Sequence, residues 1–333
     1  MELVDVLDSK GKKTGRKATI DEICDHGYWH HSVHGVIITK DNKIVAQKRS
    51  HKIIMNPGLI EISAGGIVNA GEDPDQAIIR EIKEELGIDV DSSEVFYINT
   101  KTHNKHFEKL NKTTKTFLFS YVIKLHNPLA HIKLEQSESE NIYLLSLKKA
   151  KRLVRYHRLL RLGRITPFYS YWKFSIVQAE KFIHPRLHFV CRGNTFRSRL
   201  AEEYFRSQNK NNNIIRVMSS GIQADQRLNG GISYLAKQLL ARHNLISHKK
   251  SWTQTTQRNI NNSTIVIFMS QTVFEDADKR FDLSSTKYIV WNIPDVKKNS
   301  SEAGLEEAEN IYKKIITNIQ DFKKSKLYKS IFS

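Results

Sequence analysis

The chain has 333 residues, long for a single core, and this length favours about two domains. Its apolar content of 39% excludes wholesale disorder, and its two cysteines are too few for a disulfide-framed secreted protein. We find no secretory signal and no apolar run long enough for a transmembrane segment, so we expect a soluble, cytoplasmic protein. The net charge of +18 favours anionic partners, but it does not choose among phosphorylated substrates, nucleic acid and an acidic membrane surface.

The first half of the chain predicts a mixed α/β domain over residues 1–182. Two strands are expected at 33–39 and 44–47, joined by the turn residues Asp41 and Asn42. A helix is expected from Pro74 to Leu86, because proline suits a first turn and Gly87 stands where a terminating glycine belongs. Further strands are expected at 116–125 and 142–147. A helical stretch at 148–164 then holds eight basic residues and no acidic one.

The pattern changes in the second half, which we assign to a domain over residues 183–333. Five aromatic residues between 168 and 174 come first, and we expect them to pack onto the first domain or at the seam between domains. Strands are then expected at 187–190, 214–218, 264–269 and 288–291, alternating with helices at 198–208, 231–244 and 303–322. This alternation predicts an α/β domain with a doubly wound parallel sheet.

Three glutamates on the helix expected at 74–86 are the first candidate for chemistry. Glu81, Glu84 and Glu85 are spaced so that their carboxylates share one helical face. Like charges so placed repel unless a cation joins them, and Mg²⁺ prefers a few carboxylate oxygens together with substrate phosphate oxygens. Such an ion would polarise a phosphoryl group and orient an attacking water. The alternative is an amphipathic surface helix of ordinary composition.

Residues around these glutamates are expected to brace the site. Arg80 is expected on another face of the helix, where it can pair with Glu72 and hold the preceding loop against the helix. Gly65 and Gly66 would let the backbone turn sharply before that loop.

The full segment resembles the Nudix box, which reads Gly, five residues, Glu, seven residues, Arg-Glu, an aliphatic residue, any residue, Glu-Glu, any residue, Gly, aliphatic. Every defined position is filled, by Gly66, Glu72, Arg80, Glu81, Ile82, Glu84, Glu85, Gly87 and Ile88. The resemblance implies an α/β/α sandwich that cleaves a nucleoside diphosphate linked to another moiety, or another diphosphate, with Mg²⁺ or Mn²⁺. It assigns the metal to Glu81, Glu84 and Glu85, catalysis to Glu84 and Glu85, and structural support to Gly65, Gly66, Glu72, Arg80 and Gly87.

The sequence around the box is similar to the Nudix branch that borders on isopentenyl-diphosphate isomerases. The similarity rests on residues 2–8, 28–31, 47–50 and 57–58. Isomerases carry a catalytic cysteine in the strand leading to the box, where this chain has Ile-Ser-Ala-Gly-Gly at 62–66, so hydrolysis is favoured over isomerisation. Glu61 is a further candidate carboxylate near the metal. His30, His31 and His34 are either metal or substrate ligands or, in the interpretation we favour, surface or hydrogen-bonded core residues.

Cys191 is the second candidate for chemistry, because it directly follows the apolar strand expected at 187–190 and is separated from the next helix by a short loop. A loop of this length can turn its backbone N–H groups inward as an oxyanion cradle, whose positive field favours the nucleophilic thiolate. Arg197 would clamp two phosphate oxygens, and Ser198 would donate to the thiolate as it leaves. We expect the cradle to comprise Arg192, Gly193, Asn194, Thr195, Phe196 and Arg197. The alternative is a buried structural cysteine beside a chance arginine.

The wider sequence resembles the low-molecular-weight protein-tyrosine phosphatase family. Its opening motif is matched at 189–191, 193–194, 197–198 and 201–202, and its later strands at 219–222 and 265–269. The resemblance implies hydrolysis of phosphorylated small molecules or of a phosphoprotein through a phosphocysteine, with no cofactor. Asp295, which follows Ile293-Pro294, is then the general acid that protonates the leaving oxygen and activates the water of the second step.

Two departures from that family's pattern bear on the substrate. Phe196 stands where a second cysteine is frequent, and the only other cysteine is the distant Cys24, so arsenate reduction is disfavoured. Val296, Lys297 and Lys298 follow Asp295 where tyrosine-specific members carry tyrosines, so phosphotyrosine is not supported as the substrate.

These observations favour a bifunctional hydrolase, and the fusion alone suggests that one site makes a phosphomonoester that the other removes. The basic stretch at 148–164 is interpreted as a solvated helical face or an interdomain contact. A surface that gathers a phosphorylated substrate or RNA, or one that meets a membrane, is an alternative. Two other functions stay open: an RNA 5′-end-processing or RNA-binding protein, and a regulatory protein in which one catalytic site is degenerate.

Overall fold

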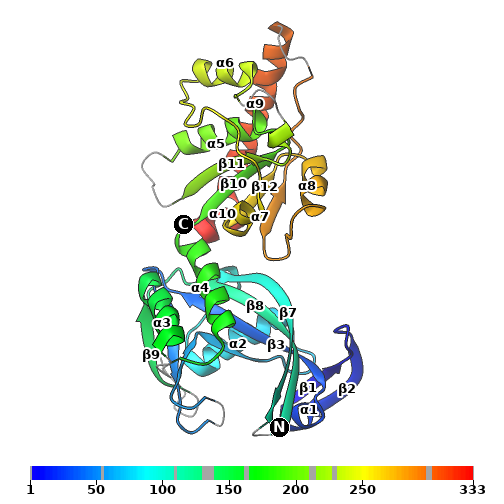
Figure 1. The fold of residues 1–333 in the computed structure, drawn as a ribbon, viewed down its shortest axis with the longest axis vertical. Helices are drawn as coiled ribbons and strands as arrows, with labels where there is room; N and C mark the ends of the chain where they lie inside the picture. The colour runs from blue at the N-terminus through cyan, green and yellow to red at the C-terminus, as the bar shows by residue number, and fades with distance from the viewer. Residues whose placement is uncertain are drawn as a thin grey trace. The chain divides into compact units, whose positions relative to one another are not determined.

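The computed structural model describes residues 2–53, 56–108, 111–129, 139–160, 165–209, 215–226, 231–297 and 302–332 (Figure 1). The chain divides into two compact units, Met1–Ile183 and His184–Ser333. Two segments predicted from sequence reach beyond the described residues: positions 161–164 of the basic stretch and position 214 of a predicted strand.

A nine-stranded sheet in the described residues forms the first unit. Its central strand β3 pairs in parallel with β8 and antiparallel with β1, β4 and β6, while β7 extends the sheet beyond β8. In chain order, the elements are β1 (Leu3–Leu7), β2 (Lys13–Thr19), α1 (Ile20–His26), β3 (Trp29–Ile38), β4 (Ile44–Arg49), β5 (Ile60–Ile62), β6 (Ala64–Ile67), α2 (Pro74–Leu86), β7 (Val95–Phe107), β8 (Lys112–Lys124), β9 (Ser139–Leu145), α3 (Leu147–Leu160) and α4 (Tyr169–Ile183).

Helices cover both faces of the central part of this sheet. Val33 of β3 belongs to the apolar core that α2 forms through Ala77, Ile78 and Ile82. The next residue, His34, contacts Tyr171 of α4 with ring centroids 4.0 Å apart. Because successive side chains of a strand point to opposite faces, α2 and α4 lie on opposite sides of β3. This arrangement is the α/β/α sandwich expected from the sequence.

Local signals set the bounds of α2, which begins at Pro74 and ends at Leu86 as predicted. The side chain of Asp73 accepts a hydrogen bond from the backbone N–H of Asp75, and Pro74 occupies the first turn. Gly87 then adopts a left-handed conformation with φ of 65°, which stops the helix where few other residues would do so without strain.

The second unit holds a four-stranded sheet in the described residues, with all strands parallel in the order β11-β10-β12-β13. In chain order, its elements are β10 (Arg186–Cys191), α5 (Arg197–Ser207), β11 (Arg216–Gly221), α6 (Tyr234–Arg242), α7 (Gln257–Asn261), β12 (Ile265–Phe268), α8 (Gln271–Asp278), β13 (Lys287–Val290), α9 (Glu302–Lys324) and α10 (Lys326–Phe332).

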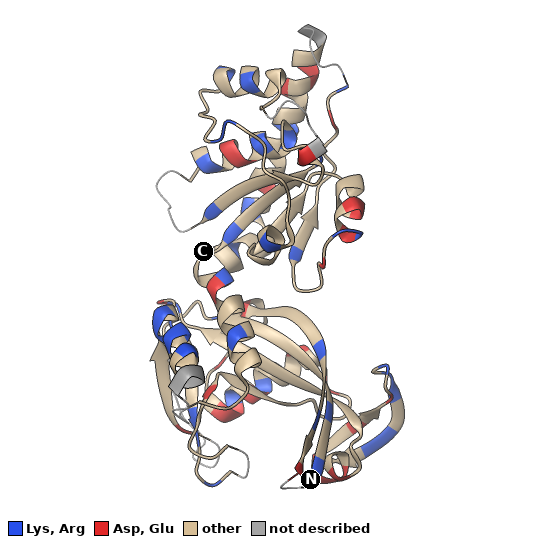
Figure 2. Ribbon diagram, in the orientation of Figure 1, with Lys and Arg blue, Asp and Glu red and all other residues tan. Residues whose placement is uncertain are grey.

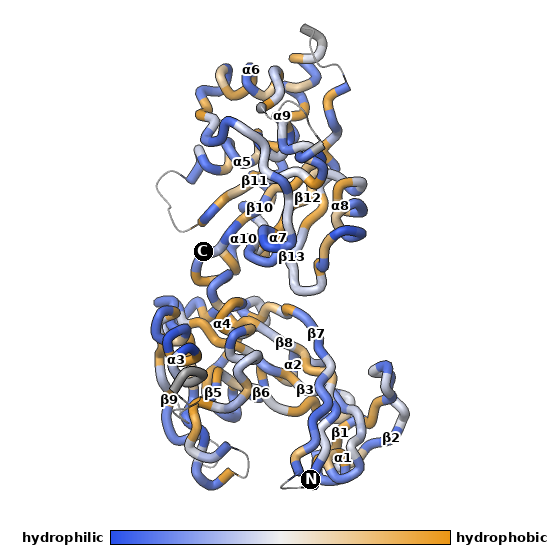
Figure 3. The backbone as a smooth tube through the Cα atoms, viewed as in Figure 1, coloured by the Kyte–Doolittle hydropathy of each residue, from blue (hydrophilic) through white to orange (hydrophobic). Residues whose placement is uncertain are grey.

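The parallel sheet is covered on both faces, which confirms the doubly wound expectation. The four residues of β12 are all apolar and buried (Figure 3). Val190 of β10 belongs to a core cluster with residues of α7 and α8. Its neighbour Phe189 points to the opposite face, where it packs on Phe205 of α5. Cys191 therefore ends a central strand at the carboxyl edge of the sheet, where open α/β sheets bind their ligands.

Candidate active sites

The predicted glutamates lie on α2, and Arg80 is at the centre of their contacts. The Arg80 guanidinium donates to both carboxylate oxygens of Glu72, at 2.9 and 3.0 Å, and to the carbonyl oxygen of Ile67 at 2.9 Å. Its Nη1 also donates to Glu81 at 2.9 Å and to Glu84 at 2.8 Å. The expected pairing of Arg80 with Glu72 is present, but the expectation that Arg80 lies on another helical face is wrong. Arg80 and Glu84 are spaced i, i+4 and share a face, and the long Arg80 side chain also reaches the adjacent Glu81.

These contacts stabilise the charged forms of Glu72, in the loop before α2, and of Arg80. Burial opposes ionisation of Glu72, but the hydrogen bonds from Arg80 and from the backbone N–H of Asn69 hold its pKa below the ordinary value. The carboxylates around Arg80 raise the pKa of its guanidinium, with Glu72 making the largest contribution. Arg80 is thus a permanent cation that ties the loop to the helix.

Two adjacent glycines let this loop pass close to the carboxylates. A Cβ atom on Gly66 would lie 2.1 Å from the carboxylate carbon of Glu81, so the Glu81 head group occupies the space that a side chain would fill. A Cβ atom on Gly65 would lie 2.7 Å from the backbone oxygen of Val33 on the neighbouring strand. The two glycines are required by close approach on both sides of the chain.

Glu85 is the most enclosed of the three helix carboxylates. It is 8% exposed, and its Oε2 accepts a hydrogen bond of 2.8 Å from the side-chain amide of Gln47 on β4. Gln47 in turn accepts a hydrogen bond from Ser139 of β9. The neighbouring strands therefore fix the orientation of the Glu85 carboxylate. Sequence reasoning missed the role of Gln47, since only the fold brings β4 beside α2.

The donor chemistry of this site fits a hard divalent cation. Glu81, Glu84 and Glu85 offer carboxylate oxygens from one helical face. The loop with Gly65 and Gly66 passes close to the Glu81 carboxylate. Within the described residues, no group of three His, Cys, Asp or Glu side chains is already gathered tightly enough to hold a metal ion. A cation bound by Glu81 and Glu84 would replace their contacts with Arg80, which would keep those with Glu72.

The other candidate ligands of the first unit have structural partners. Arg49 forms an ion pair with Glu61 across β4 and β5. The ring nitrogen Nε2 of His34 lies 2.6 Å from the backbone oxygen of Ile62, and burial holds the pKa of His34 well below its ordinary value. Burial also lowers the pKa values of His30 and His31. His30 and His34 are buried beside backbone oxygens, as the favoured interpretation expects, whereas the partly buried His31 packs edge-on against Phe117 and Phe119.

In the second unit, Cys191 faces polar groups rather than an apolar interior. It is 3% exposed, and its Sγ lies 3.0 Å from the hydroxyl of Ser198. The backbone N–H of Asn194 donates to Sγ at 3.2 Å, so the loop curls back over the sulfur. Because α5 begins at Arg197, its first-turn N–H groups lie at the same loop.

Asn194 holds the loop in shape. Its φ of 53° is in the left-handed region that asparagine tolerates better than most residues. Its side-chain nitrogen donates to Ser198 at 2.9 Å and to Ser219 at 2.8 Å, and its side-chain oxygen accepts from the backbone N–H of Thr253 at 2.8 Å. Sequence reasoning placed Asn194 in the cradle, but not Ser219 or Thr253, which are distant along the chain.

The rest of the predicted cradle is packed against β11 and its following turn. A Cβ atom on Gly221 would lie 2.6 Å from the nitrogen of Asn194 and 2.7 Å from the carbonyl carbon of Gly193. The carbonyl oxygen of Arg192 accepts from Gln223, and that of Thr195 accepts from Ser233. Phe196 is buried, whereas the Arg192 side chain is exposed. These backbone contacts therefore fix the conformation of the loop.

The structure brings Arg197 and Asp295 together. Arg197 is 5% exposed, and its guanidinium donates to the backbone oxygen of Ile293 at 2.9 Å and to the carboxylate of Asp295 at 2.8 Å. The Asp295 side chain is 58% exposed, so its carboxylate is open to solvent. Arg197 begins the helix that follows the cradle, and Asp295 is an exposed carboxylate in contact with it, so the two supply the cation and the proton donor that transfer of a phosphoryl group to the thiolate requires.

A buried ion-pair network is connected to the loop between Cys191 and Arg197 through hydrogen bonds. Glu202 of α5 is fully buried and accepts hydrogen bonds from Ser219 at 2.5 Å and from Arg206 at 2.7 Å. Arg199, also fully buried, lies beside Glu202 and Glu203. Ser219 thus links the network to the Asn194 side chain.

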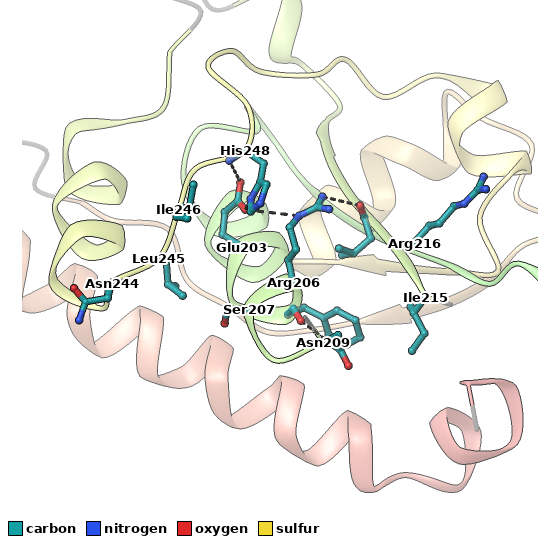
Figure 4. Close-up of a pocket in the computed structure, with 12 residues that line it drawn as sticks. Glu203, Arg206, Ser207, Asn209, Ile215, Arg216, Asn244, Leu245, Ile246 and His248 are labelled. Carbon is teal, nitrogen blue, oxygen red and sulfur yellow. Dashed lines mark hydrogen bonds and ion pairs between the residues drawn. The ribbon is translucent and has the colours of Figure 1, made fainter. Parts of the chain in front are cut away.

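Beyond this network is a cavity of about 540 Å³ lined by residues of α5, β11 and the segment after α6. Glu203, Arg206 and His248 point toward one another at its side (Figure 4). Cys191 is not among the residues that line this cavity, so we assign the cavity no part in the chemistry at the sulfur.

Two protein-family models match this chain, one in each of its two units. The NUDIX domain model matches residues 29–163, and the model of the low molecular weight phosphotyrosine protein phosphatase matches residues 186–329. An uncharacterized Nudix hydrolase of Rhodococcus erythropolis is 30% identical over 139 residues, covering 41% of this chain and 75% of that protein. Another, of Clostridium acetobutylicum, is 25% identical over 156 residues, covering 46% and 74%.

A solved structure similar to the second unit is a low molecular weight protein tyrosine phosphatase from T. tengcongensis. It is 19% identical, with a TM-score of 0.35, and the match covers 41% of this chain and 99% of that one. None of the helices in the described part of the chain combines the length and apolarity needed to cross a membrane.

Proposed function

The chain belongs to the Nudix hydrolase family through its first unit and to the low-molecular-weight phosphotyrosine protein phosphatase family through its second, and we propose that both sites are active on phosphate esters. Both families are hydrolytic, so the chain is a hydrolase with two domains. In the proposal, the first site cleaves a diphosphate and the second cleaves a phosphomonoester. The observation that carries the proposal is the placement of Cys191 beside Ser198 and Asn194, with Arg197 joined to Asp295.

At the second site, the Cys191 thiolate attacks phosphorus while Arg197 and the loop N–H groups hold the other phosphate oxygens. The bond from phosphorus to the leaving oxygen breaks, and Asp295 gives that oxygen its proton. Water then attacks the phosphocysteine and loses its proton to Asp295. Sγ leaves as a thiolate, which Ser198 stabilises from 3.0 Å, and inorganic phosphate is released. No metal takes part in these steps.

At the first site, Glu81, Glu84 and Glu85 would hold Mg²⁺ or Mn²⁺. The ion supplies charge neutralisation at the diphosphate oxygens and lowers the pKa of a bound water. Glu84 and Glu85 are the carboxylates that can take the proton from the attacking water. Gln47 orients Glu85, while Arg80 and Glu72 hold the loop in register with the helix. Cleavage of the P–O–P linkage leaves two phosphorylated products.

Chemistry links the two sites, because the product of the first reaction is the kind of ester that the second consumes. The wild-type chain is expected to convert a dinucleotide-type diphosphate through a monophosphate to inorganic phosphate. A Cys191→Ser variant should stop at the monophosphate, and a Glu84→Ala variant should leave the diphosphate intact. If both variants give the same products as the wild type, the sequential scheme is refuted.

RNA is a second candidate substrate, favoured by the basic residues of α3 (Figure 2). Lys148, Lys149, Lys151, Arg152 and Arg155 are all exposed. Lys151 pairs with Glu180 at 2.7 Å, so part of this charge is already balanced. Binding of a 5′-triphosphorylated RNA that weakens steeply with added salt would support this candidate, and salt-insensitive or undetectable binding would remove it.

A reducing compartment such as the cytoplasm suits this proposal. The catalytic step needs Cys191 as a free thiol, and both Cys191 and Cys24 are free in the structure. Reversible loss of phosphatase activity on mild oxidation, with no loss of Mg²⁺-dependent diphosphate cleavage, is the expected behaviour.

A further inference from the structure

The cavity beside Glu203 in the second unit is separate from both candidate active sites. Its volume of about 540 Å³ is in the range of sites that bind small molecules. Its wall comes from α5 and the residues directly after it, from β11, and from residues 244–248 after α6. The residues assigned to phosphoryl transfer at Cys191 do not line it. We call it the α5–β11 cavity.

Apolar side chains form much of this wall. Phe205 of α5 is fully buried, and Ile215 and Val217 lie on one face of β11 because they are two residues apart. Leu245 and Ile246 are on the other side of the cavity from Ile215 (Figure 4). The Ile246 residue is 69% exposed, so an aliphatic surface is open to a ligand here. A ligand with an apolar body would remove part of this surface from water.

Arg206 provides a cationic group at the same wall. Its Nη2 donates to Glu202 at 2.7 Å and to the backbone oxygen of Val217 at 3.1 Å, while its Nε is buried 3.8 Å from Glu203. The Arg206 side chain is 34% exposed. Its Nη1 is therefore the guanidinium nitrogen that these contacts leave for a ligand.

The one acidic residue among the described residues that line the cavity is Glu203, and its carboxylate is already occupied. Its Oε1 accepts a hydrogen bond of 2.9 Å from the backbone N–H of His248, and its Oε2 lies 2.6 Å from Nδ1 of the same residue. Figure 4 shows the Glu203 carboxylate turned toward His248. The side chain of Glu203 is also fully buried, so it presents little negative charge to a ligand.

The ion-pair network behind the wall has more cations than anions. Its carboxylates are those of Glu202 and Glu203, and both side chains are fully buried. The cations that contact them are Arg199, Arg206 and Lys249. Three cations and two carboxylates give a net charge of +1 when His248 is neutral. Because charges interact more strongly away from water, this excess favours an anion at the cavity.

We propose that the α5–β11 cavity binds a small organic acid, with its apolar body between Ile215 and Ile246 and its carboxylate on Nη1 of Arg206. The carboxylate balances the excess positive charge, and the apolar body covers the aliphatic wall. A neutral ligand of the same shape would leave the charge unbalanced, and a cation would add to it. The site makes and breaks no bond, so it does not depend on either proposed reaction.

The test compares three naphthalene probes on the full-length chain by isothermal titration calorimetry. 1-Naphthoate is an anion, 1-naphthalenemethanol is neutral and 1-naphthylmethylamine is a cation. Orthovanadate is present throughout to occupy the cradle at Cys191, and Mg²⁺ is left out so that the first site holds no cation. We expect naphthoate to bind with a Kd on the order of 0.1 mM. The alcohol should bind roughly tenfold more weakly, and the amine should show no measurable binding.

Two variants change the wall of the cavity. Arg206→Gln removes the guanidinium and should weaken naphthoate binding roughly tenfold or more, as expected for loss of a charge-assisted hydrogen bond. It should change binding of the alcohol less than about twofold. Ile246→Asp places a carboxylate on the apolar wall and should also weaken naphthoate binding roughly tenfold. Because Ile246 is exposed, this variant keeps the test decisive if Arg206→Gln does not fold.

Matched controls make the same changes away from the cavity. Arg242→Gln removes an exposed guanidinium at the end of α6, and Leu144→Asp adds a carboxylate at an exposed aliphatic position on β9 of the first unit. Neither control should change naphthoate binding. The proposal would be overturned by equal affinities for naphthoate and the alcohol, by equal losses in Arg206→Gln and Arg242→Gln, or by the absence of naphthoate binding to the wild type.

Discussion

Replacing Gly66 with alanine should disable the first site and leave the second intact. The backbone of Gly66 is one that alanine also adopts, so the effect comes from the new methyl group. Its carbon would lie 2.1 Å from the Glu81 carboxylate carbon, and ordinary contact begins at 3.4 Å, so that carboxylate must retreat by at least 1.3 Å. A displacement of this size at a catalytic group costs about 100-fold in rate.

Stability should change little in the same variant. The group that must move is the end of a flexible side chain, and Arg80 keeps its contacts with Glu72 and Glu84. We expect a loss of about 1 kcal/mol or less in the free energy of unfolding of the first unit. A larger loss would mean that Glu81 is held rigidly and cannot turn aside.

The assay follows two activities of one preparation. Mg²⁺-dependent release of product from a diphosphate substrate should fall about 100-fold, with a weaker apparent affinity for Mg²⁺. Hydrolysis of p-nitrophenyl phosphate by the second unit serves as the internal control and should stay at the wild-type rate. Unchanged Mg²⁺-dependent activity in Gly66→Ala would refute the placement of Glu81 at the reacting centre.

Three further predictions concern the second unit. In Gly221→Ala, the new Cβ would lie 2.6 Å from the backbone nitrogen of Asn194, so the cradle backbone must shift. Hydrolysis of p-nitrophenyl phosphate should therefore be lost, while Mg²⁺-dependent hydrolysis by the first unit persists. Asn194→Ala and Asn194→Gly both lose three buried hydrogen bonds, at about 1 kcal/mol each. Alanine should destabilise the unit by about 1 kcal/mol more than glycine because of the left-handed φ, so equal denaturation midpoints would contradict this account. Burial, with smaller contributions from Lys249 and Arg186, lowers the pKa of His188 to about 3 from 6.5. As pH falls, His188 therefore takes up a proton in the unfolded state before it does so in the folded state. The free energy of unfolding that is present above pH 6.5 should then decrease progressively toward pH 3. In a His188→Gln variant, chemical denaturation should show a smaller decrease over the same pH range.

Local signals made much of the fold predictable. Pro74 and Gly87 mark the ends of α2 in the sequence itself, and the structure places the helix between them. The strand ending at Cys191 is a short apolar run, typical of a buried parallel strand, and strand–helix alternation then gives the topology.

Elements shaped by tertiary contacts were harder to predict. The cationic and polar half of β7 lacks strand periodicity, and it is extended because it pairs along its length with β8. The aromatic run within α4 gives no clear polar face, because both β3 and α3 pack against this helix. Strands β1, β2, β5 and β6 are short or polar enough to escape detection by pattern.

The residues of the candidate sites also divide into those that local sequence indicates and those that only the fold brings together. Residues within one loop or helix, such as Glu81 and Arg197, are spaced along the chain in a way that indicates their role. Gln47 and Ser219 reach the sites only through sheet pairing and helix packing, so no local spacing indicates them. The i, i+4 spacing of Arg80 and Glu84 does indicate their contact, whereas the contact of Arg80 with the adjacent Glu81 depends on the conformation of the long arginine side chain.

The most direct test of two independent phosphoryl-binding sites is a reciprocal inactivation in the full-length chain. Cys191→Ser and Glu85→Gln are each assayed for metal-independent p-nitrophenyl phosphate hydrolysis and for Mg²⁺-dependent cleavage of a nucleoside diphosphate derivative. Cys191→Ser should abolish the first activity and spare the second, and Glu85→Gln should do the reverse. Loss of both activities in either variant, or of neither, would contradict the assignment of one reaction to each site.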